Sequence, residues 1–490
     1  MLGAAHVYWG AIFADESFYL YASKLVASGK TLYRDFFYLQ NPAFPYVYAL
    51  PIGLWSSPYA GRILSLVFSV VALLATVGLA RRLSNEAGAA IAAVLLGLNA
   101  FHAYFAVIVR VYAPTAAFLA IGAYLYARIR RPVVAATLAA VCFAVAVAFR
   151  LTAAPAIAGL VIALLLRREL RAAVAAAIAA AVVVALPFLP FLLVVPARIL
   201  VYQAVGFHTE IRNVGGPAAM VIVKLRTLPD VAANYMLLWL ALLIAVAITV
   251  GARGRAGVPA LLGEGKERDL WVVALVNLAA QSVAMNVQAD YYEPGIALPM
   301  ALAGAALARN LRFPRPAPAA LLAAGTLQAL AHGTGSMDID RHLHGPFTQL
   351  RPYVDFVRSA ARPAETVMTS DSQLVPFMAG REILHGFESF EYFPSWTRER
   401  CREFGVCNDE MILELVGARV PAAILLSDYS YRKPFPISVD QGPERRQRIL
   451  DRIAEGYDLG ATFPSPYFQG GKSYVYVRRP GRPPGSSRAP

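Results

Sequence analysis

The chain has few charged residues. Asp, Glu, Lys and Arg make up only 16% of its 490 residues, whereas 58% are hydrophobic. A soluble protein of this length carries nearer a quarter charged residues. The composition therefore predicts a polytopic membrane protein.

Acidic residues are scarcer than basic ones, and the formal net charge is +14. Such a charge can indicate a nucleic-acid partner, but its distribution argues otherwise. Residues 1–336 hold 25 Lys and Arg against 12 Asp and Glu, while residues 337–490 hold 20 against 19. The excess lies between apolar runs, where positive charge sets membrane topology. We therefore expect no nucleic-acid partner.

Cofactor motifs are also missing. No Walker loop, dinucleotide fingerprint or zinc signature is present, which disfavours a nucleotide-driven enzyme or pump. His342 and His344 in "RHLHG" are two donors without placed partners, which is weak evidence for a metal site. We predict no cofactor, and a divalent metal is not indicated. Residues 1–14 have no basic n-region, so no cleavable signal peptide is predicted.

Long apolar runs are abundant. The run at 2–14 is shorter than the others and covers about 20 Å of a hydrocarbon core of about 30 Å. The first helix is therefore expected to be short or truncated. Ten further runs are long enough to span a bilayer, or nearly so, and lie at about 59–80, 87–107, 111–127, 133–149, 151–166, 172–195, 231–250, 270–289, 294–308 and 317–333.

The connectors between these runs predict an orientation. One alternate set, which includes "ARRLSNE", "RIRRP" and "RRELR", holds 15 Lys and Arg in about 47 residues. The other set holds nine in about 99 residues. By the positive-inside rule the first set is cytoplasmic. With an odd number of about eleven helices, the C-terminal part then lies outside.

The pattern changes near Met337. "ETVMTS", "AAILLSDY" and "SYVYVRR" are typical of short strands. "NDEMILELV", with Asn408 or Asp409 as its cap, and "GPERRQRILDRIAEG" are typical of helices. We therefore expect a mainly α polytopic membrane protein with a C-terminal extracytoplasmic α/β domain. The expected domains are a transmembrane domain at 1–336, the α/β domain at 337–478 and a disordered tail at 479–490.

The stretch "FADESFYLYASKLVASGKTLYRDFFYLQNPAFPY" follows the first apolar run. It begins with the carboxylates Asp15 and Glu16, and an amphipathic helix up to Gly29 is expected to lie along the membrane interface. The acid pair has a simple structural interpretation, because carboxylates favour helix N-termini. The alternative is that the pair acts on a ligand at the outer surface.

Several cations are expected on the same side: Arg110 in "VRVYAP", Arg150 in "FRLTA", Lys224 and Arg226. Ionisable groups at membrane depth usually face a cavity or a partner, although these cations could instead contact lipid phosphate. Tyr291 and Tyr292 in "ADYYEPGIALP" lie at another outer hairpin, where an interfacial tyrosine belt is the alternative explanation. A carboxylate with cations beside a bilayer suits a lipid phosphate ligand.

The first 60 residues resemble the first outer loop of integral-membrane glycosyltransferases of the C fold, in particular protein O-mannosyltransferases and the lipid A aminoarabinose transferase. The "VRVY" and "YYEPGIALP" hairpins are also similar. The chain departs from the family at Leu39-Gln40-Asn41-Pro42, which replaces a Glu-Lys-Pro-Pro and its phosphate-binding lysine, and at Asp290, where many members carry Arg. The matching residues are Asp15, Glu16, Tyr19, Gly29, Tyr33-Arg34-Asp35, Pro42 and Arg62.

The resemblance implies a glycosyltransferase that moves a hexosyl or pentosyl group, with inversion, from a polyprenyl-phosphate donor to a hydroxyl of a lipid, glycan or protein. It implies a bacterial inner-membrane protein with its active site on the periplasmic or extracellular side. Asp15 is expected to be the general base, with Glu16 orienting the loop and Asp35 as the second candidate. The donor phosphate is expected to contact Arg110, Arg150, Lys224, Arg226, Tyr291 and Tyr292, while Tyr33, Arg34 and Asn41 support the acceptor or the loop.

The alternative is a transporter or flippase of a lipid-linked glycan. A transporter is expected to place ionisable groups or broken helices near the bilayer midplane. Here the predicted helix interiors are almost free of charge, which favours chemistry on one side.

Cys401 and Cys407 in "CREFGVC" are predicted to form a disulfide, because the outer compartment is oxidising and Gly405 allows a turn. The alternative is two free thiols. A helix over 398–407 would separate the two by about 9 Å along its axis and prevent the bond.

Overall fold

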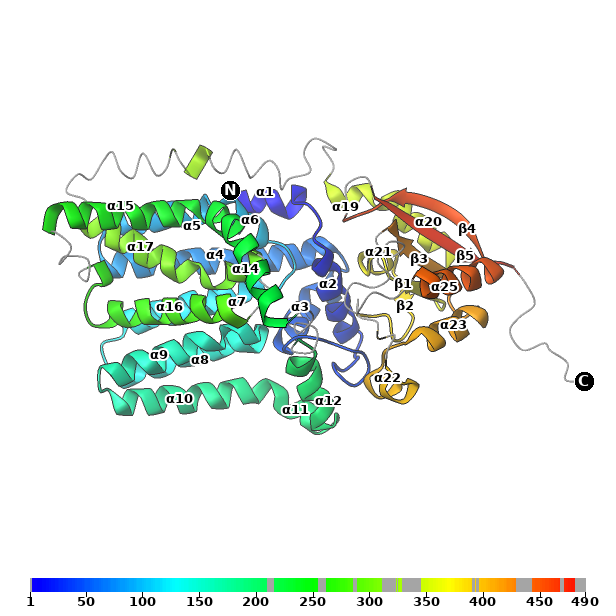
Figure 1. Cartoon of the computed structure of the whole chain (residues 1–490), viewed down its shortest axis with the longest axis horizontal. Helices are drawn as coiled ribbons and strands as arrows, with labels where there is room; N and C mark the ends of the chain where they lie inside the picture. The colour runs from blue at the N-terminus through cyan, green and yellow to red at the C-terminus, as the bar shows by residue number, and fades with distance from the viewer. Residues whose placement is uncertain are drawn as a thin grey trace, which may run out of the picture.

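The computed structural model describes residues 2–208, 216–253, 261–284, 289–310, 323, 325–327, 345–389, 393, 396–428, 443–467 and 471–480. These residues form two parts, a helical bundle up to residue 310 and a C-terminal domain over 345–480 (Figure 1). We call the end of the bundle next to the C-terminal domain the domain-facing end.

The helices of the bundle follow the apolar runs. Polar caps start several of them: the Ser57 hydroxyl accepts from Tyr59 N, and the Asn85 side chain accepts from the second and third amides of α5. The elements are α1 Leu2–Trp9, α2 Ala14–Ala27, α3 Ala43–Leu54, α4 Pro58–Leu83, α5 Glu86–Gly97, α6 Ala100–Phe105, α7 Tyr112–Arg128, α8 Pro132–Phe149, η1 Leu151–Ala153, α9 Ala154–Leu166, α10 Leu170–Ala185, η2 Leu186–Phe188, α11 Leu189–Leu192, α12 Ala197–Val201, the π-helix η3 Tyr202–Gly206, α14 Gly216–Asn234, α15 Met236–Arg253, α16 Lys266–Ala284, η5 Ala289–Gly295 and α17 Ala297–Asn310.

Several helices are apolar enough for a membrane, in agreement with the composition. Within the described residues, Pro58–Leu83, Pro132–Phe149 and Leu170–Leu192 are each long and apolar enough to span one. The pair Leu225–Asn234 and Met236–Gly251 qualifies as a fourth span if its 80° bend is accepted. The expected number of about eleven spans therefore stays a prediction, and most of the run at 317–333 lies outside the described residues.

Some of the predicted runs are interrupted. The run at 87–107 divides into α5 and α6 because Asn99 leaves the helix and caps α6, accepting from His102 N. In the first run, α1 ends at Trp9 and α2 begins at Ala14, which agrees with the expected short first helix.

The predicted amphipathic helix after the first run is present as α2, and a second helix follows it. Figure 1 shows α2 and α3 between the bundle and the C-terminal domain. α3 was not predicted, although its sequence "AFPYVYALPIGL" is apolar. It leaves Leu50 70% and Leu54 82% exposed on one face, the pattern of a helix that covers an apolar phase.

Ion pairs lie at the end of the bundle opposite the domain-facing end, where the connectors rich in arginine lie (Figure 1). Arg167 pairs with Asp269 at 2.7 Å, and Arg309 pairs with Glu267 at 2.7 Å. Both carboxylates come from the start of α16. The connectors rich in Lys and Arg, from which the orientation was predicted, thus lie at the end of the bundle away from the C-terminal domain.

The C-terminal domain contains a mixed five-stranded sheet in the order β2-β1-β3-β5-β4. β2, β1 and β3 are parallel, and β5 pairs antiparallel with both β3 and β4. The sequence predicted β1, β3 and β5, but not β2 or β4. β2 is very short and β4 has only weak alternation of buried residues. The strands are β1 Thr366–Thr369, β2 Glu382–Ile383, β3 Ala423–Ser427, β4 Tyr457–Pro464 and β5 Lys472–Arg478.

Helices pack around this sheet, and both predicted ones are confirmed. Asn408 caps α23 by accepting from Met411 N at 3.0 Å, and α25 ends at Gly456 as expected. The helices are α19 Pro346–Gln349, α20 Arg351–Ala360, α21 Leu374–Ala379, α22 Arg398–Phe404, α23 Asp409–Gly417 and α25 Pro443–Gly456.

Several contacts join the two parts of the molecule, and two groups of them lie beside the first loop. On α2, the Tyr21 hydroxyl accepts from Ile383 N at 2.7 Å, and Ser17 donates to Gln373 at 3.0 Å. Beside this contact, an apolar cluster joins the first loop, the segment around η3 and the C-terminal domain. We call it the three-segment cluster; its buried residues are Phe37, Leu39, Phe207, Trp396, Cys401 and Val406.

Candidate active site

The site centres on Arg110, which lies between two carboxylates. Its Nη2 donates to Asp15 Oδ2 at 2.6 Å, and its Nη1 donates to Asp290 Oδ2 at 2.6 Å. The hydroxyl of Tyr112 donates to the same Asp290 oxygen at 2.7 Å. Arg110 and Asp290 are almost fully buried, whereas the Asp15 side chain is 42% exposed. Only one of the two carboxylates is therefore accessible to a ligand.

Aromatic rings cover the Arg110 guanidinium. Its central carbon lies 4.5 Å from the ring centre of Phe13 and 4.3 Å from that of Tyr112. Rings of this kind attract a cation and keep water away from it. Because charges interact more strongly away from water, the contact of Arg110 with the two carboxylates fixes the geometry firmly.

Arg150 shares the ring of Tyr112 with Arg110, and we call the rings of Tyr112 and Tyr291 the aromatic floor. Its guanidinium is 4.5 Å from the Tyr112 ring centre and 5.1 Å from that of Tyr291. Nε donates to the Thr152 hydroxyl at 2.7 Å. Among the described residues, no carboxylate lies within ion-pair distance of Arg150, although the residue is 94% buried. A buried cation without an acidic partner suits an anionic ligand.

Asp15 owes its place to the start of α2. Phe13 is extended, α2 begins at Ala14, and Asp15 and Glu16 occupy its first turn, where the helix dipole favours negative charge. The dipole argument from the sequence therefore holds. It does not exclude function, because successive residues of a helix point in different directions.

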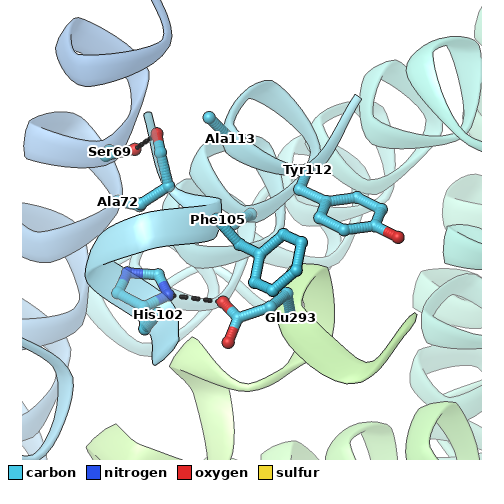
Figure 2. A pocket seen from close by; sticks show the side chains of 9 residues that line it. Ser69, Ala72, His102, Phe105, Tyr112, Ala113 and Glu293 are labelled. Carbon is cyan, nitrogen blue, oxygen red and sulfur yellow. Dashed lines mark hydrogen bonds and ion pairs between the residues drawn. The ribbon is translucent and has the colours of Figure 1, made fainter. Parts of the chain in front are cut away.

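A second buried pair lies deeper in the bundle. His102 Nδ1 is 2.7 Å from Glu293 Oε2, as Figure 2 shows. The Tyr235 hydroxyl donates to the other carboxylate oxygen of Glu293 at 2.8 Å. The sequence patterns did not single out His102 or Tyr235, because their partners are distant in the chain.

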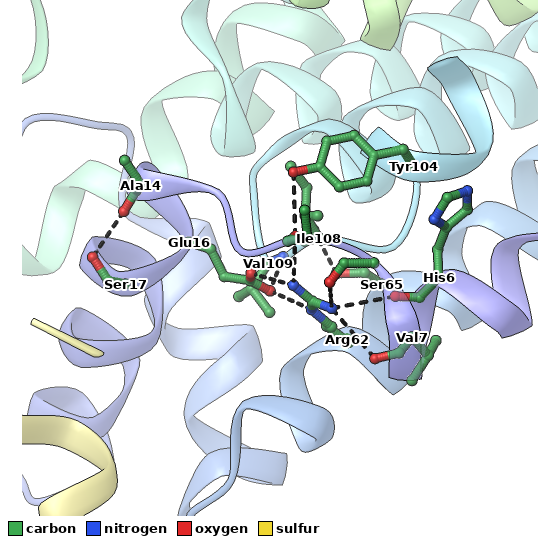
Figure 3. Close-up of polar contacts among 12 residues, drawn as sticks. His6, Val7, Ala14, Glu16, Ser17, Arg62, Ser65, Tyr104, Ile108 and Val109 are labelled. Atoms are coloured by element: carbon green, nitrogen blue, oxygen red, sulfur yellow. Dashed lines mark hydrogen bonds and ion pairs between the residues drawn. The ribbon is translucent and has the colours of Figure 1, made fainter. Parts of the chain in front are cut away.

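Glu16 points away from Asp15 into the protein. Its carboxylate forms two hydrogen bonds with Arg62, at 2.8 Å to Nε and 2.6 Å to Nη2, and accepts from Val109 N at 3.1 Å (Figure 3). Both side chains of the ion pair are fully buried. Glu16 was grouped with the catalytic candidates as the residue that orients the loop, and this arrangement has the geometry of that orienting role.

Arg62 also holds the segment before α2. Its guanidinium donates to the carbonyl oxygens of His6 at 3.2 Å, Gly10 at 2.8 Å and Ala11 at 3.1 Å. These carbonyls lie in the last turn of α1 and just beyond it, where carbonyls commonly lack a partner within the helix, and the His6 carbonyl also accepts from Gly10 N at 2.9 Å. One arginine thus fixes both sides of the turn that presents Asp15.

No protein-family model and no curated protein matches the chain. Solved structures do. ArnT from Cupriavidus metallidurans bound to undecaprenyl phosphate superimposes with a TM-score of 0.65 at 13% identity, over 100% of this chain and 97% of that one. The chain has the C fold of integral-membrane glycosyltransferases.

Two further C-fold structures support this. ArnT in the apo state gives a TM-score of 0.64 at 13% identity and covers 97% of this chain and 95% of that one. The apo oligosaccharyltransferase of Archaeoglobus fulgidus gives 0.50 at 13% identity and covers 98% of this chain and 72% of that one. The fold predicted from the first loop is thus confirmed over the whole chain.

The rest of the first C-fold loop has a structural role. Asp35 accepts from Arg34 Nε and from Thr31 N, each at 2.7 Å. The hydrogen bond from Arg34 lowers the pKa of Asp35. Asp35 is therefore held within its own loop and makes none of the contacts of the Asp15–Arg110 pair.

Tyr33 and Asn41 hold this loop in place. Tyr33 has a left-handed φ of 65°, is buried, and donates its hydroxyl to Gln40 O at 2.6 Å. Strain of this kind persists only where the surroundings hold the residue. Asn41 donates to Val147 O at 2.5 Å and so ties the loop to α8.

The predicted donor-binding residues separate into two groups. Arg110, Arg150 and Tyr291 come together, as described above. Tyr292 instead turns into the bundle and lies 2.8 Å from the Ser282 hydroxyl. Arg226 is exposed on α14, and the side chain of Lys224 lies outside the described residues, as do His342 and His344.

The predicted disulfide between Cys401 and Cys407 is absent, because both cysteines are free and buried. α22 ends at Phe404 and Gly405 turns the chain, as expected, but the two thiols enter different apolar clusters. Cys401 joins the three-segment cluster, while Cys407 packs near His385 and Gly386. Burial raises the pKa of the Cys401 thiol to about 11, so this thiol is a poor nucleophile.

Proposed function

We propose that the chain is a glycosyltransferase that moves a sugar from a polyprenyl-phosphate donor to a hydroxyl acceptor at the outer membrane–water interface, with inversion. One observation carries this: two arginines lie over the same ring of Tyr112. Arg110 holds the accessible carboxylate of Asp15, and Arg150 has no ion-pair partner among the described residues.

Asp15 is suited to act as the general base. Its carboxylate takes the proton of the acceptor hydroxyl while the acceptor oxygen attacks the anomeric carbon opposite the phosphate. The bond between that carbon and the phosphate oxygen breaks, and polyprenyl phosphate leaves with the electron pair. Arg110 holds Asp15 in place, since it contacts the carboxylate at 2.6 Å.

Arg150 is suited to hold the phosphate. Negative charge grows on the phosphate as it leaves, and a fixed cation in a site sheltered from water lowers the barrier most. The rings of Tyr112 and Tyr291 keep the guanidinium in place. ArnT binds undecaprenyl phosphate, which supports a ligand of this class here.

The arrangement also favours transfer over transport. Within the described residues, the arginine ion pairs named so far lie at the two ends of the bundle, and only the His102–Glu293 contact described above lies deeper: Arg110–Asp290 and Arg62–Glu16 are at one end, Arg167–Asp269 and Arg309–Glu267 at the other. The site lies next to the C-terminal domain, and we propose that both are on the periplasmic side of a bacterial inner membrane. The acceptor is a hydroxyl of a lipid, glycan or protein.

The test is turnover in lipid nanodiscs with undecaprenyl-phosphate hexoses and pentoses, followed by release of undecaprenyl phosphate. In Asp15→Asn, turnover should fall by about 10²- to 10⁴-fold, the usual contribution of a general base. Binding of undecaprenyl phosphate should persist, because Arg150 is untouched.

Near-normal turnover of Asp15→Asn would refute Asp15 as the base. Movement of the lipid-linked sugar between leaflets of proteoliposomes, without release of undecaprenyl phosphate, would establish the transporter alternative instead.

A further inference from the structure

The segment η5 supplies two side chains of the site, although its backbone does not form a regular α-helix. Asp290 reaches Arg110 and Tyr291 lies beneath Arg150. η5 is a 3₁₀-helix with Pro294 inside it. Such helices have poor hydrogen-bond geometry, so contacts from outside must hold them.

Arg110 comes from a segment that is also irregular. It follows the short helix α6, and its amide donates to Ile108 O at 2.8 Å in a tight turn. The Arg110–Asp290 contact therefore joins two irregular segments. The distance of 2.6 Å between Arg110 Nη1 and Asp290 Oδ2 therefore depends on the contacts that set how far apart the two segments lie.

The His102–Glu293 pair joins the same two segments further inside the bundle. His102 lies on α6 and Glu293 on η5, and their side chains are 10% and 2% exposed (Figure 2). We call His102–Glu293 the inner pair and Arg110–Asp290 the outer pair. The two pairs are successive cross-links between one stretch of chain and another.

The inner pair is anchored to the bundle on both sides. Tyr235 donates to Glu293 at 2.8 Å, and its hydroxyl also lies 3.3 Å from Ala289 O at the start of η5. On the other segment, Asn99 caps α6 and donates to Asn234 O at 2.8 Å. Neighbouring residues of the α14–α15 junction thus hold both segments.

Close packing fixes the far end of η5. A Cβ atom on Gly295 would come within 2.5 Å of Asn277 Nδ2, so η5 lies directly against α16. The inner pair also lines one cavity of ≈ 10 Å³ together with Phe105 and Tyr112. If the inner pair moves, the packing next to the Tyr112 ring of the aromatic floor changes with it.

We propose that His102 and Glu293 are positioning residues of the active site: the inner pair sets the separation at which Arg110 contacts Asp15 and Asp290 together. It also holds Tyr291 beneath Arg150. The inference rests on the proposed function for its catalytic consequence, but not for its geometry.

The physical reason is that Arg110 is a single cation shared by two carboxylates. If η5 moves away from Arg110, the contact between Arg110 and Asp290 is broken and Arg110 contacts Asp15 alone. Tyr291 moves with η5, so the support beneath Arg150 is lost too. A misplacement of about 1 Å can cost on the order of a hundredfold in rate.

The first experiment measures geometry and needs no substrate. Arg110→Cys and Asp290→Cys are combined in a chain whose three natural cysteines are replaced by alanine, and a short thiol-bridging reagent is added. Bridging should be efficient and should fall severalfold when Glu293→Leu is added, because leucine has no oxygen to bind His102 or Tyr235. Glu267→Leu is the matched control, because Glu267 forms a partly buried ion pair with Arg309 at the opposite end of the bundle.

Retained bridging in Glu293→Leu, an equal loss in Glu267→Leu, or no bridging in the parent would each overturn the proposal. Because this experiment uses no sugar donor, its result stands whether or not the chain transfers sugar.

The second experiment compares two replacements of His102 in the nanodisc turnover assay. His102→Asn places an amide nitrogen where Nδ1 was and should keep the bond to Glu293, so turnover stays near normal. His102→Leu fills the space without a donor, and turnover should fall by about a hundredfold. A role in apolar packing alone predicts the opposite order, and that result would refute the positioning role.

Discussion

At the residue scale, Arg150 stands out because it is a buried cation beside aromatic rings, and no described carboxylate pairs with it. Arg150→Ala should weaken binding of undecaprenyl phosphate by about 10- to 150-fold, the equivalent of about 1.5–3 kcal/mol for a hydrogen bond to a charged group. Titration of the lipid phosphate against the protein in nanodiscs measures this.

Arg226→Ala is the matched control for Arg150, because it removes the same charge from an exposed position on α14. Its affinity for the lipid phosphate should stay close to that of the natural chain. Equal losses in both variants would mean that the effect is general electrostatic attraction and not a defined phosphate site.

Asp371 in the C-terminal domain gives a prediction on pH. Burial raises its pKa to about 6, and its partner is the Tyr353 hydroxyl, which donates at 3.0 Å. The folded state therefore binds a proton that the unfolded state has lost, from about pH 4 to about pH 6. The contribution of Asp371 to stability should be greatest near pH 4 and should fall as the pH rises through this window.

Melting temperatures of the natural chain and Asp371→Asn, measured across this range, test the sign. The natural chain should lose stability relative to the variant as the pH rises from about 4 to about 6, and the difference should then level off. A difference that does not change with pH would contradict a buried, titrating Asp371. Other groups cancel in the comparison, including Asp409, whose pKa burial also raises to about 6.

At the scale of elements, the turn between α1 and α2 depends on the Glu16–Arg62 pair. Glu16→Gln leaves the Arg62 charge buried without a full ionic partner, which typically costs about 3–5 kcal/mol. Thermal unfolding should show this loss, and turnover should fall with it, because Asp15 lies in the same first turn of α2.

The control for this turn is Glu86→Gln, because Glu86 forms an exposed ion pair with Arg81 on the adjacent helices. Exposed pairs contribute little, so this variant should melt like the natural chain. Similar stability of Glu16→Gln and Glu86→Gln would show that the turn does not depend on the buried pair.

The elements themselves were largely predictable, for physical reasons. Apolar runs bounded by caps, such as α4 after Ser57, gave helices close to the expected limits. Failures occurred where tertiary contacts decide, as at the break near Asn99, whose side chain reaches Asn234 O. α3 was missed because its apolar residues lie in a segment interpreted as an outer loop.

The site was only partly predictable. Asp15 and Arg110 could be proposed because each lies at an outer helix end next to an apolar run. Asp290 appeared in the sequence as a departure from the family, and nothing local showed that it would share Arg110 with Asp15. The predicted Cys401–Cys407 bond failed for a similar reason, since burial in separate clusters, and not spacing, decides where each thiol points.

At the scale of the whole molecule, the C-terminal domain contacts the helix that carries the proposed base. Tyr21→Phe removes the hydroxyl that accepts from Ile383 N, and Ser17→Ala removes the bond to Gln373. Each loss should cost about 1–3 kcal/mol, because a buried partner is left unsatisfied. Hydrogen exchange should become faster at Ile383 and along α2.

Tyr474→Phe is the control for this joint, because its hydroxyl bonds to Asp428 within the C-terminal domain. It should leave exchange along α2 unchanged. Unaltered exchange at α2 in Tyr21→Phe would mean that the domain does not stabilise this helix.

The three-segment cluster has a consequence for engineering. Phe37 belongs to the first loop, Phe207 to the segment after η3, and Trp396 to the C-terminal domain, yet they share one apolar core. A chimera that exchanges the C-terminal domain alone between C-fold proteins would set foreign side chains against Phe37 and Phe207. Exchange should give a folded protein only when all three stretches are transferred together. In the construction of chimeras the three stretches therefore behave as one unit, although they are far apart in the chain.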